Sequence, residues 1–248
     1  MSKSMSLFSA LFCTFIWGTT FIAQDTGMDK IGPLTFNATR FFVGFLSIIP
    51  FALLIEKKKI SKEINSNKKL FFKLLFWVGL FLFFGTYLQQ AALLYTDVAN
   101  AAFFTIFYVP MVPIIIFFIY SKSIHWSIWP SVLFCVFGVY LLSDFSDATI
   151  RLGDGLVILC ALFWALHIIF IGNFAKSFDL PLFLGALQTL VVSFFSFIFA
   201  IFFETITIAN ILNESISIIY AGVLSGGIAF TLQIYAQKNI SPAPAGII

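Results

Sequence analysis

LFCTFIWGTTFIA, residues 11–23, is the stretch from which the architecture of this chain can be read, because its pattern recurs in the second half. Its cysteine and tryptophan, Cys13 and Trp17, recur 147 residues further on as Cys160 and Trp164, again inside an apolar run. The first copy contains five apolar runs, an odd number, so the second copy must enter a membrane with the opposite polarity. Inverted repeats of this kind are typical of secondary transporters.

The rest of the chain repeats at nearly the same spacing. Further pairs in equivalent places are Pro33 with Pro181 at an offset of 148, and Gln89 with Gln233 and Ala92 with Ala236 at an offset of 144. The repeat predicts two units, residues 1–143 and residues 152–248, each a copy of one five-helix design.

The composition indicates a membrane protein. Of the 248 residues, 60% are hydrophobic and 10% are charged, and the mean hydropathy is +1.03, whereas soluble domains carry about 25% charged residues. A net charge of +3 in such a chain does not point to nucleic acid, so we expect the lipid bilayer and a small-molecule substrate as partners. The three cysteines lie in apolar runs without CxxC or Cys/His spacing. We therefore predict no metal site, no disulfide framework and no cofactor.

A helix that crosses the bilayer core needs about 20 apolar residues. Eight runs of that size are predicted to be full transmembrane helices: 5–24, 33–55, 70–93, 97–119, 126–143, 153–173, 181–203 and 215–237. The runs are too long for buried strands and lack the alternation of membrane barrels. The sequence therefore predicts an all-α polytopic membrane protein.

The cations predict the orientation, because cytoplasmic loops carry an excess of Lys and Arg. With the N-terminus inside, all of the 14 cations are cytoplasmic except Lys30, Arg40 and Arg151. The hydrophilic loop 56–69 is then a basic cytoplasmic anchor, with lipid headgroup binding as the alternative. The opposite orientation is rejected.

A ninth apolar run begins near Ser241 and stops at Ile248, too soon to cross a bilayer. By the offset of 144, position 143 maps to about position 287. We expect a ten-helix design. This chain would contain eight full spans and a stub of the ninth helix, and roughly 40 residues, the rest of helix nine and all of helix ten, would be missing. We favour the interpretation that this sequence is a fragment of a longer gene product over the alternative of a natural eight-helix protein.

Four stretches in order resemble one family of transporters. They are LFCTFIWGTTFIA with its Trp-Gly pair, GPLTFNATRFFVGFL, YLQQAALLYTDVANAAFFTIFYVPMVPII and YAQKNISPAPAGII. The chain resembles the EamA type of the drug/metabolite transporter superfamily over essentially its whole length. The resemblance implies ten helices, two inverted five-helix repeats and export or exchange of small metabolites across the bacterial inner membrane. Asp97 departs from the Ser or Thr expected at its position.

Polar and aromatic groups at membrane depth predict a cavity between the repeats, because such groups are costly in a bilayer. His167 lies one helical turn after Trp164, and by the repeat it corresponds to Thr20, one turn after Trp17. The four residues form a symmetric set near the midplane, where inverted-repeat transporters bind substrate. The alternative is that His167 donates a hydrogen bond to a neighbouring helix and the tryptophans only pack.

Three amides are further candidates for the cavity. Gln233 and Gln237 are four residues apart on the eighth predicted span, and Gln89 is the repeat partner of Gln233. An amide offers two donors and an acceptor, which suits a zwitterionic or polar metabolite. Hydrogen bonds between helices are the alternative.

Arg40 lies eight residues into the second span, and its repeat partner is Gln188. Its long side chain can reach outward toward water, or it can pair with Asp25 or Asp97 near the outer face. We favour a structural or gating role for Arg40 over contact with substrate.

Two prolines and two glycines predict bends or close packing. Pro110 and Pro113 remove hydrogen bonds in the fourth span and predict either a hinge or a static kink. Gly222 and Gly226 form a GxxxG pattern on the eighth span, which is typical of close helix packing.

These features favour a secondary transporter, an exporter or exchanger of small metabolites such as amino acids or related compounds. An intramembrane sensor or scaffold would usually carry a soluble domain, and a lipid-acting enzyme would need a catalytic cluster near an interface. The two histidines, His125 and His167, lie in different halves, so we predict no catalytic residues and no enzyme. Proton coupling would need His167, because no Asp or Glu lies at mid-membrane. The oligomeric state stays open, with a dimer as one option.

Overall fold

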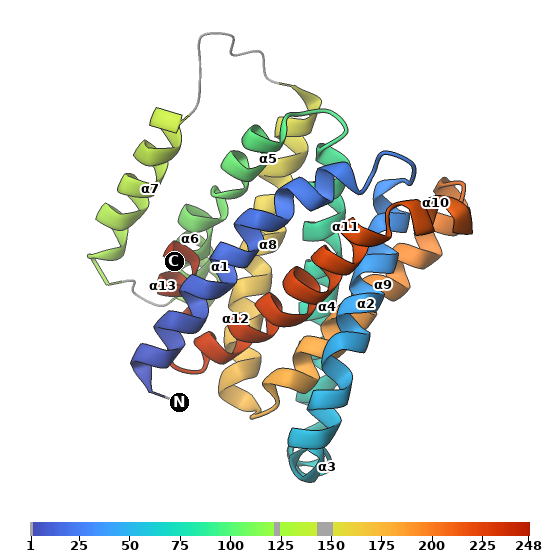
Figure 1. Ribbon diagram of the computed structural model, residues 1–248. Helices are drawn as coiled ribbons and strands as arrows, with labels where there is room; N and C mark the ends of the chain where they lie inside the picture. The colour runs from blue at the N-terminus through green and yellow to red at the C-terminus, as the bar shows by residue number, and fades with distance from the viewer. Residues whose placement is uncertain (1, 122–124, 143–150) are drawn as a thin grey trace.

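The computed structural model describes residues 2–121, 125–142 and 151–248, and these residues form helices and connecting turns without a strand. The elements in chain order are α1 Lys3–Thr26, α2 Pro33–Ile55, α3 Lys57–Ser66, α4 Lys68–Ala92, α5 Val98–Thr105, α6 Tyr108–Tyr120, α7 Ile128–Leu142, α8 Leu152–Ser177, α9 Pro181–Phe203, α10 Ile208–Asn213, α11 Ser215–Tyr220, a π-helix Ala221–Ala229, α12 Phe230–Gln237 and α13 Pro242–Ile247. Figure 1 shows α7 at one edge of the bundle and α3 protruding at one end. The prediction of an all-helical chain is confirmed.

Seven helices in the described part of the chain are long and apolar enough to cross a membrane. They are Lys3–Thr26, Pro33–Ile55, Lys68–Ala92, Val98–Ile119, Leu152–Ser177, Pro181–Phe203 and Ser215–Gln237. All seven coincide with predicted spans. Large apolar side chains cover their outer surfaces, as at Leu54, Phe202 and Ile216, and such a surface is stable against lipid rather than water. The protein is therefore a multi-pass membrane protein.

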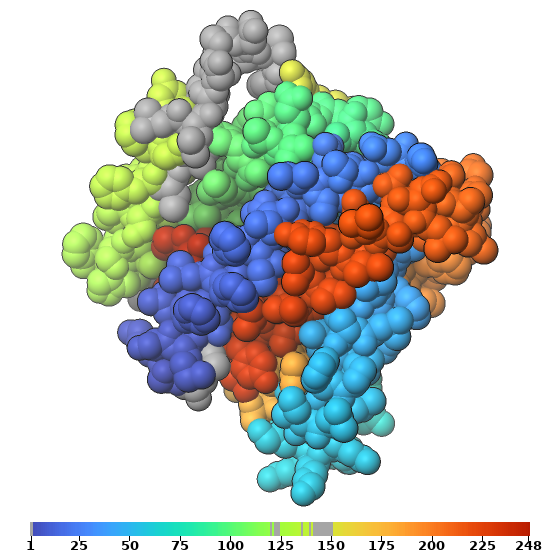
Figure 2. Space-filling view, viewed as in Figure 1, coloured from blue at the N-terminus to red at the C-terminus, as the bar shows by residue number. Residues whose placement is uncertain are grey.

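Seven of the eight predicted full spans are confirmed, and the fifth stays a prediction. The described part of its helix, α7, has 15 residues from Ile128 to Leu142, where a full span needs about 20. The predicted end of this run, Ser143, lies outside the described residues. Helix α7 packs at the periphery against α6 and α13, and Figure 2 shows it at the edge of the molecule. The predicted stub is α13, whose six residues pack on α6, α7 and α8.

Helices α2 and α9 form the main contact between the two halves of the chain. Glu204, which follows α9, accepts hydrogen bonds from the backbone N–H groups of Leu34 and Thr35 at 2.8 Å each, at the start of α2. The end of α9 therefore lies at the start of α2, so the two helices run antiparallel. The carboxylate satisfies N–H groups that have no partner inside their own helix.

At the other end of this pair, Glu56 accepts hydrogen bonds from the backbone N–H groups of Leu182 and Phe183 at 3.0 and 2.9 Å. Glu56 follows α2, and the two N–H groups belong to the first turn of α9. Burial raises the pKa of the Glu56 carboxyl, and the two backbone N–H groups act in the opposite direction. Each helix of the pair is thus capped by a carboxylate from the end of the other.

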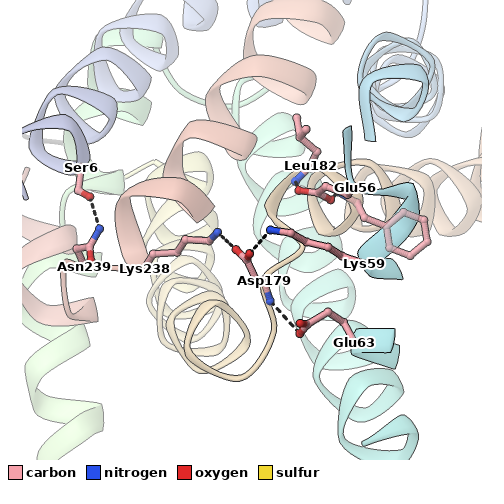
Figure 3. Close-up of polar contacts among 9 residues, drawn as sticks. Ser6, Glu56, Lys59, Glu63, Asp179, Leu182, Lys238 and Asn239 are labelled. Carbon is pink, nitrogen blue, oxygen red and sulfur yellow. Dashed lines mark hydrogen bonds and ion pairs between the residues drawn. The ribbon is translucent and has the colours of Figure 1, made fainter. Parts of the chain in front are cut away.

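A polar cluster beside Glu56 joins three parts of the chain. Asp179, in the turn between α8 and α9, forms ion pairs with Lys59 of α3 and with Lys238, directly after α12. The backbone N–H of Asp179 also donates a hydrogen bond to Glu63 of α3. Figure 3 shows Asp179 between the two lysines. The two ammonium groups hold the pKa of Asp179 below its usual range.

The fourth span is broken at Ile106 and Phe107, between α5 and α6. Pro110 lies four residues after Ile106, and its ring clashes with the carbonyl at that position and supplies no N–H. Pro113 lies inside α6 and does not interrupt it. The break thus follows from Pro110, and it lies beside Thr105 and Tyr108, which line the cavity described below.

The π-helix in the last full span packs closely against α2. A Cβ on Gly222 would lie 2.6 Å from the carbonyl oxygen of Arg40, and a Cβ on Gly44 would lie 2.9 Å from the carbonyl oxygen of Gly222. These two glycines therefore let the two backbones approach at a distance that side chains would prevent, whereas a Cβ on Gly226 would make an ordinary contact with Gly44. π-Helical segments often occur at functional sites, and Ser225 of this segment lines the cavity.

Candidate functional site

A central cavity lies between helices of both halves. Its walls are α1, α2, α4, α5 and α6 from the first half, and α8, the π-helix, α12 and α13 from the second. The space open to the centre of a water molecule is about 90 Å³, whereas a single water needs about 10–15 Å³ by that measure. The cavity can therefore hold a small organic molecule. Figure 2 shows α1 and α12 side by side over one face of the bundle that contains it.

Three aromatic rings form an apolar wall of the cavity. The rings of Trp17 and Trp164, from α1 and α8, are 6.3 Å apart, centre to centre. Phe230 of α12 lies 5.1 Å from Trp17 and stacks on Trp164 at 5.9 Å. The sequence had placed the two tryptophans in a cavity, and both line it. It missed Phe230, because one phenylalanine among 35 carries no signal of its own.

Amides supply much of the polar lining. Gln89 and Gln233, predicted as cavity residues, both line it. The side-chain NH₂ of Gln89 donates to Thr105 Oγ1 at 3.0 Å, whereas Gln233 Oε1 has no partner among the described residues. Gln24 of α1 also lines the cavity and has an unpartnered Oε1. It was missed because it lies at the end of the first apolar run, where a polar residue is unremarkable.

Thr20 and His167, which the sequence treats as equivalent, have different surroundings. Thr20 lines the cavity and donates its hydroxyl to the carbonyl oxygen of Trp17 at 2.8 Å. His167 is fully buried and is not part of the lining. Its Nε2 donates to Gln188 Oε1 at 3.0 Å, and its ring lies edge-on to Trp164 and Phe230. His167 therefore lies behind the aromatic wall, where it joins α8 to α9.

Gln237 is also displaced from its predicted place. It is fully buried on α12 outside the cavity lining. A Cβ on Gly172 would lie 3.2 Å from its Oε1, so the side chain faces α8. The spacing from Gln233 had suggested a shared face, but the helix turns Gln237 toward the neighbouring helix instead.

Arg40 lies in the wall of the cavity rather than near either predicted acidic partner. Its side chain is 3% exposed and its Nε donates to Asn37 Oδ1 at 2.9 Å. Asp97 pairs instead with Arg151 at 2.6 Å, and no ion pair involves Asp25 among the described residues. The Arg40 side chain therefore neither reaches outward to water nor pairs with an acid among the described residues. It is buried at the cavity.

The lining residues can bind a ligand, and the described residues include no cluster for metal chemistry. No group of three or more His, Cys, Asp or Glu side chains in the described ranges is placed to hold a metal ion. Apolar helices around a cavity with a few polar groups are typical of a multi-pass membrane protein, and such a cavity is a candidate small-molecule site. The model of the EamA-like transporter family matches residues 4–144 and again 151–248. The chain belongs to this family, which confirms the resemblance seen in its motifs.

Two relatives agree with this assignment, and a solved structure is similar in fold alone. An uncharacterized transporter of Archaeoglobus fulgidus is 30% identical over 227 residues, which are 90% of this chain and 68% of the relative. The uncharacterized transporter YoaV of Bacillus subtilis is 24% identical over 250 residues, covering 94% and 80%. A solved crystal structure is similar in fold, with a TM-score of 0.76 at 17% identity, over 99% of this chain and 83% of the other.

Proposed function

We propose that this protein is a secondary transporter that exports or exchanges small metabolites, such as amino acids or related compounds, and that the central cavity is its substrate site. One observation carries the proposal: equivalent residues of the two halves line the same cavity. They are Trp17 and Trp164, whose rings are in contact, and Gln89 and Gln233. A cavity at the interface of two related halves is where alternating access needs the substrate to bind.

The transport cycle rests on two inverted five-helix repeats within a ten-helix design. The antiparallel packing of α2 and α9, which begin at the equivalent residues Pro33 and Pro181, supports this part of the proposal. Two halves of opposite polarity can rock against one another around a fixed site. The break between α5 and α6 at Ile106 adds a flexible point beside the cavity, consistent with a gating role for Pro110.

The membrane is the bacterial inner membrane, with the N-terminus and α3 on the cytoplasmic side. Four lysines support this orientation, because α3 carries Lys57, Lys58, Lys59 and Lys62 within ten residues. At the opposite end, the segment 204–214 that contains α10 carries Glu204 and Glu214 and no cation. The excess of cations on one side is what the positive-inside rule requires.

Counterflow in liposomes tests the function. Purified protein is reconstituted into vesicles preloaded with one unlabelled amino acid at a time, and uptake of the same labelled compound is followed. We expect transient accumulation for at least one compound of a panel of amino acids and related acids. Empty vesicles and vesicles whose internal compound is left out should show none. Absence of accumulation across the whole panel, with folded protein recovered from the vesicles, would argue against transport of this class.

A matched pair of variants links transport to the cavity. Gln233→Ala removes a cavity amide whose Oε1 has no partner among the described residues, so no hydrogen bond accepted by this oxygen is lost. Ile216→Ala shortens a side chain that is 83% exposed on the outer surface. We expect Gln233→Ala to slow counterflow and Ile216→Ala to leave it unchanged. Equal rates for both variants would place the transported compound elsewhere.

A further inference from the structure

Arg40 is a buried cation at the wall of the cavity. It lies two turns into α2, is 3% exposed, and is the one charged side chain among the described residues that line the cavity. A charge at membrane depth is costly and needs either a partner or a function. Its surroundings therefore indicate what the cavity is built to bind.

The protein satisfies only part of this guanidinium group. The group has five N–H donors, and in the described part of the chain one of them, on Nε, donates to Asn37 Oδ1 at 2.9 Å. The guanidinium carbon also lies 4.7 Å and 5.3 Å from the ring centres of Phe41 and Phe36, which stabilises a cation partially. None of the ion pairs formed by the described residues involves Arg40. The charge is thus held in place by neutral groups, and no described residue serves as its counter-ion.

The backbone that carries Arg40 is firmly held. Its carbonyl oxygen lies against Gly222 of the π-helix, where a Cβ would approach to 2.6 Å. One turn further on, Gly44 packs on the backbone of Gly222 and Gly226. Because the helix is fixed by these contacts, the guanidinium is held beside the cavity without a counter-ion among the described residues. A group held in this way before the ligand arrives lowers the cost of binding.

The rest of the lining describes the remainder of the ligand. Trp17, Phe41 and Phe230 present aromatic surface. Two amide oxygens, of Gln24 and Gln233, have no partner among the described residues and can accept hydrogen bonds from a ligand. No Asp or Glu is among the described lining residues, so a purely cationic ligand would meet Arg40 without a compensating charge.

We propose that the cavity binds the carboxylate of a small organic acid with an aromatic or apolar body, and that Arg40 holds this carboxylate. The planar guanidinium fork matches a carboxylate with two parallel hydrogen bonds, and the aromatic wall packs on the body of the acid. An α-ammonium group can be accommodated by Gln24 and Gln233 but is not required. The inference rests on the proposed function, because it takes the cavity to be the substrate site.

Binding to the purified protein in detergent tests the proposal directly. Trp17 and Trp164 line the cavity, so their fluorescence reports ligands that enter it. The acids are benzoate, 3-phenylpropionate and L-phenylalanine, and the matched compounds without a carboxylate are 3-phenylpropanamide and 2-phenylethylamine. We expect at least one acid to bind and the amide and amine to bind about 30-fold more weakly or worse, the loss typical when a buried charge loses its partner. Equal binding of acid and amide, or no binding by any of the acids, would overturn the proposal.

Variants assign the effect to Arg40. Arg40→Gln should weaken binding of the same acid by about 30-fold or more, while Arg40→Lys keeps the charge, loses the fork and should give an intermediate affinity. Arg151→Gln removes a cation that pairs with Asp97 outside the cavity and should bind as the unchanged protein does. The comparison of acid with amide needs no variant, so it decides the question even where Arg40→Gln does not fold. Unchanged affinity in folded Arg40→Gln would contradict the role of Arg40.

The same acids in the counterflow assay separate this inference from the proposed function. Binding of an acid through Arg40, with no counterflow of any compound in the panel, would uphold the carboxylate site and refute transport. Counterflow of neutral or cationic compounds alone, without binding of acids, would uphold transport and refute the carboxylate site.

Discussion

Glu56 and Glu204 form a reciprocal pair: each follows one of the helices α2 and α9, and each carboxylate caps the first turn of the other helix. They are 148 residues apart, the offset that also relates Pro33 to Pro181. The four capped N–H groups stand at equivalent positions as well. The two carboxylates therefore fasten both ends of the helix pair that joins the halves, in the manner expected of the proposed inverted repeats.

Removing one of these caps should destabilise the protein. Glu204→Ala leaves the N–H groups of Leu34 and Thr35 without their acceptor, and loss of a helix cap typically costs about 1–2 kcal/mol. We expect a lower melting temperature in detergent, followed by intrinsic fluorescence. Asp29→Ala is the control, because Asp29 is an exposed carboxylate that makes no hydrogen bond or ion pair among the described residues. An equal melting temperature for the two variants would show that the cap contributes nothing.

Gly222 should not tolerate a side chain. Gly222→Ala places a Cβ 2.6 Å from the carbonyl oxygen of Arg40 and 2.8 Å from the Cβ of Val43, so α2 and the π-helix must separate. Overpacking of this kind costs about 1–3 kcal/mol, which should appear as a lower melting temperature. Gly18→Ala is the matched control, since its Cβ would meet no atom within 4 Å. A Gly222→Ala protein as stable as Gly18→Ala would mean that the close contact is absent in solution.

Asp179 should make stability depend on pH. Its pKa is lowered by the hydrogen bonds from Lys238 and Lys59, so its contribution to stability is present above the ordinary pKa of 3.8 and is lost as the pH falls through the lowered value. Asp179→Asn should therefore melt at a lower temperature than the unchanged protein at pH 7, and the difference should shrink as the pH falls below 3.8. Melting curves of both proteins between pH 3 and pH 7 measure this. A difference that stays constant over that range would exclude the ionised carboxylate as its source.

His167 and Gln188 should be coupled in stability. Their hydrogen bond is fully buried, so changing either one to Leu leaves the other without a partner, at a cost of about 1–3 kcal/mol. The double variant removes both polar groups and should cost less than the sum of the single changes. The melting temperatures of the unchanged protein, the two single variants and the double variant form a double-mutant cycle. This measurement needs no transport assay. Strict additivity would mean that the two side chains do not interact in the membrane.

The orientation can be tested by labelling. In a background without the native cysteines, Lys62→Cys places a thiol on the exposed surface of α3, and Ala209→Cys places one on α10 at the other end. A membrane-impermeant maleimide should label Ala209→Cys in intact cells and should label Lys62→Cys only after the membrane is opened. The reverse pattern would invert the proposed topology.

Much of the architecture could be read from the sequence. Long apolar runs predict helices because a membrane offers the backbone no other hydrogen-bond partners, and seven of the eight predicted spans were confirmed. The repeated tryptophan placed Trp17 and Trp164 together, and they are in contact. Glu56 and Glu204 have the same offset of 148, but their capping role could not be predicted, because a hydrogen bond between residues so far apart has no local signal.

The faces of the helices were not readable in this way. A helix that is apolar all round has no periodicity to mark its inner side, so His167 and Gln237 were assigned to the cavity and lie outside it, whereas Gln24 and Phe230 line it. For Phe230 and Gln237 the π-helix Ala221–Ala229 contributes, because it changes the direction in which the side chains of the following α12 point. Local chemistry thus specified where the helices begin and end, and their packing against one another, which depends on contacts between distant parts of the chain, set which side chains surround the ligand.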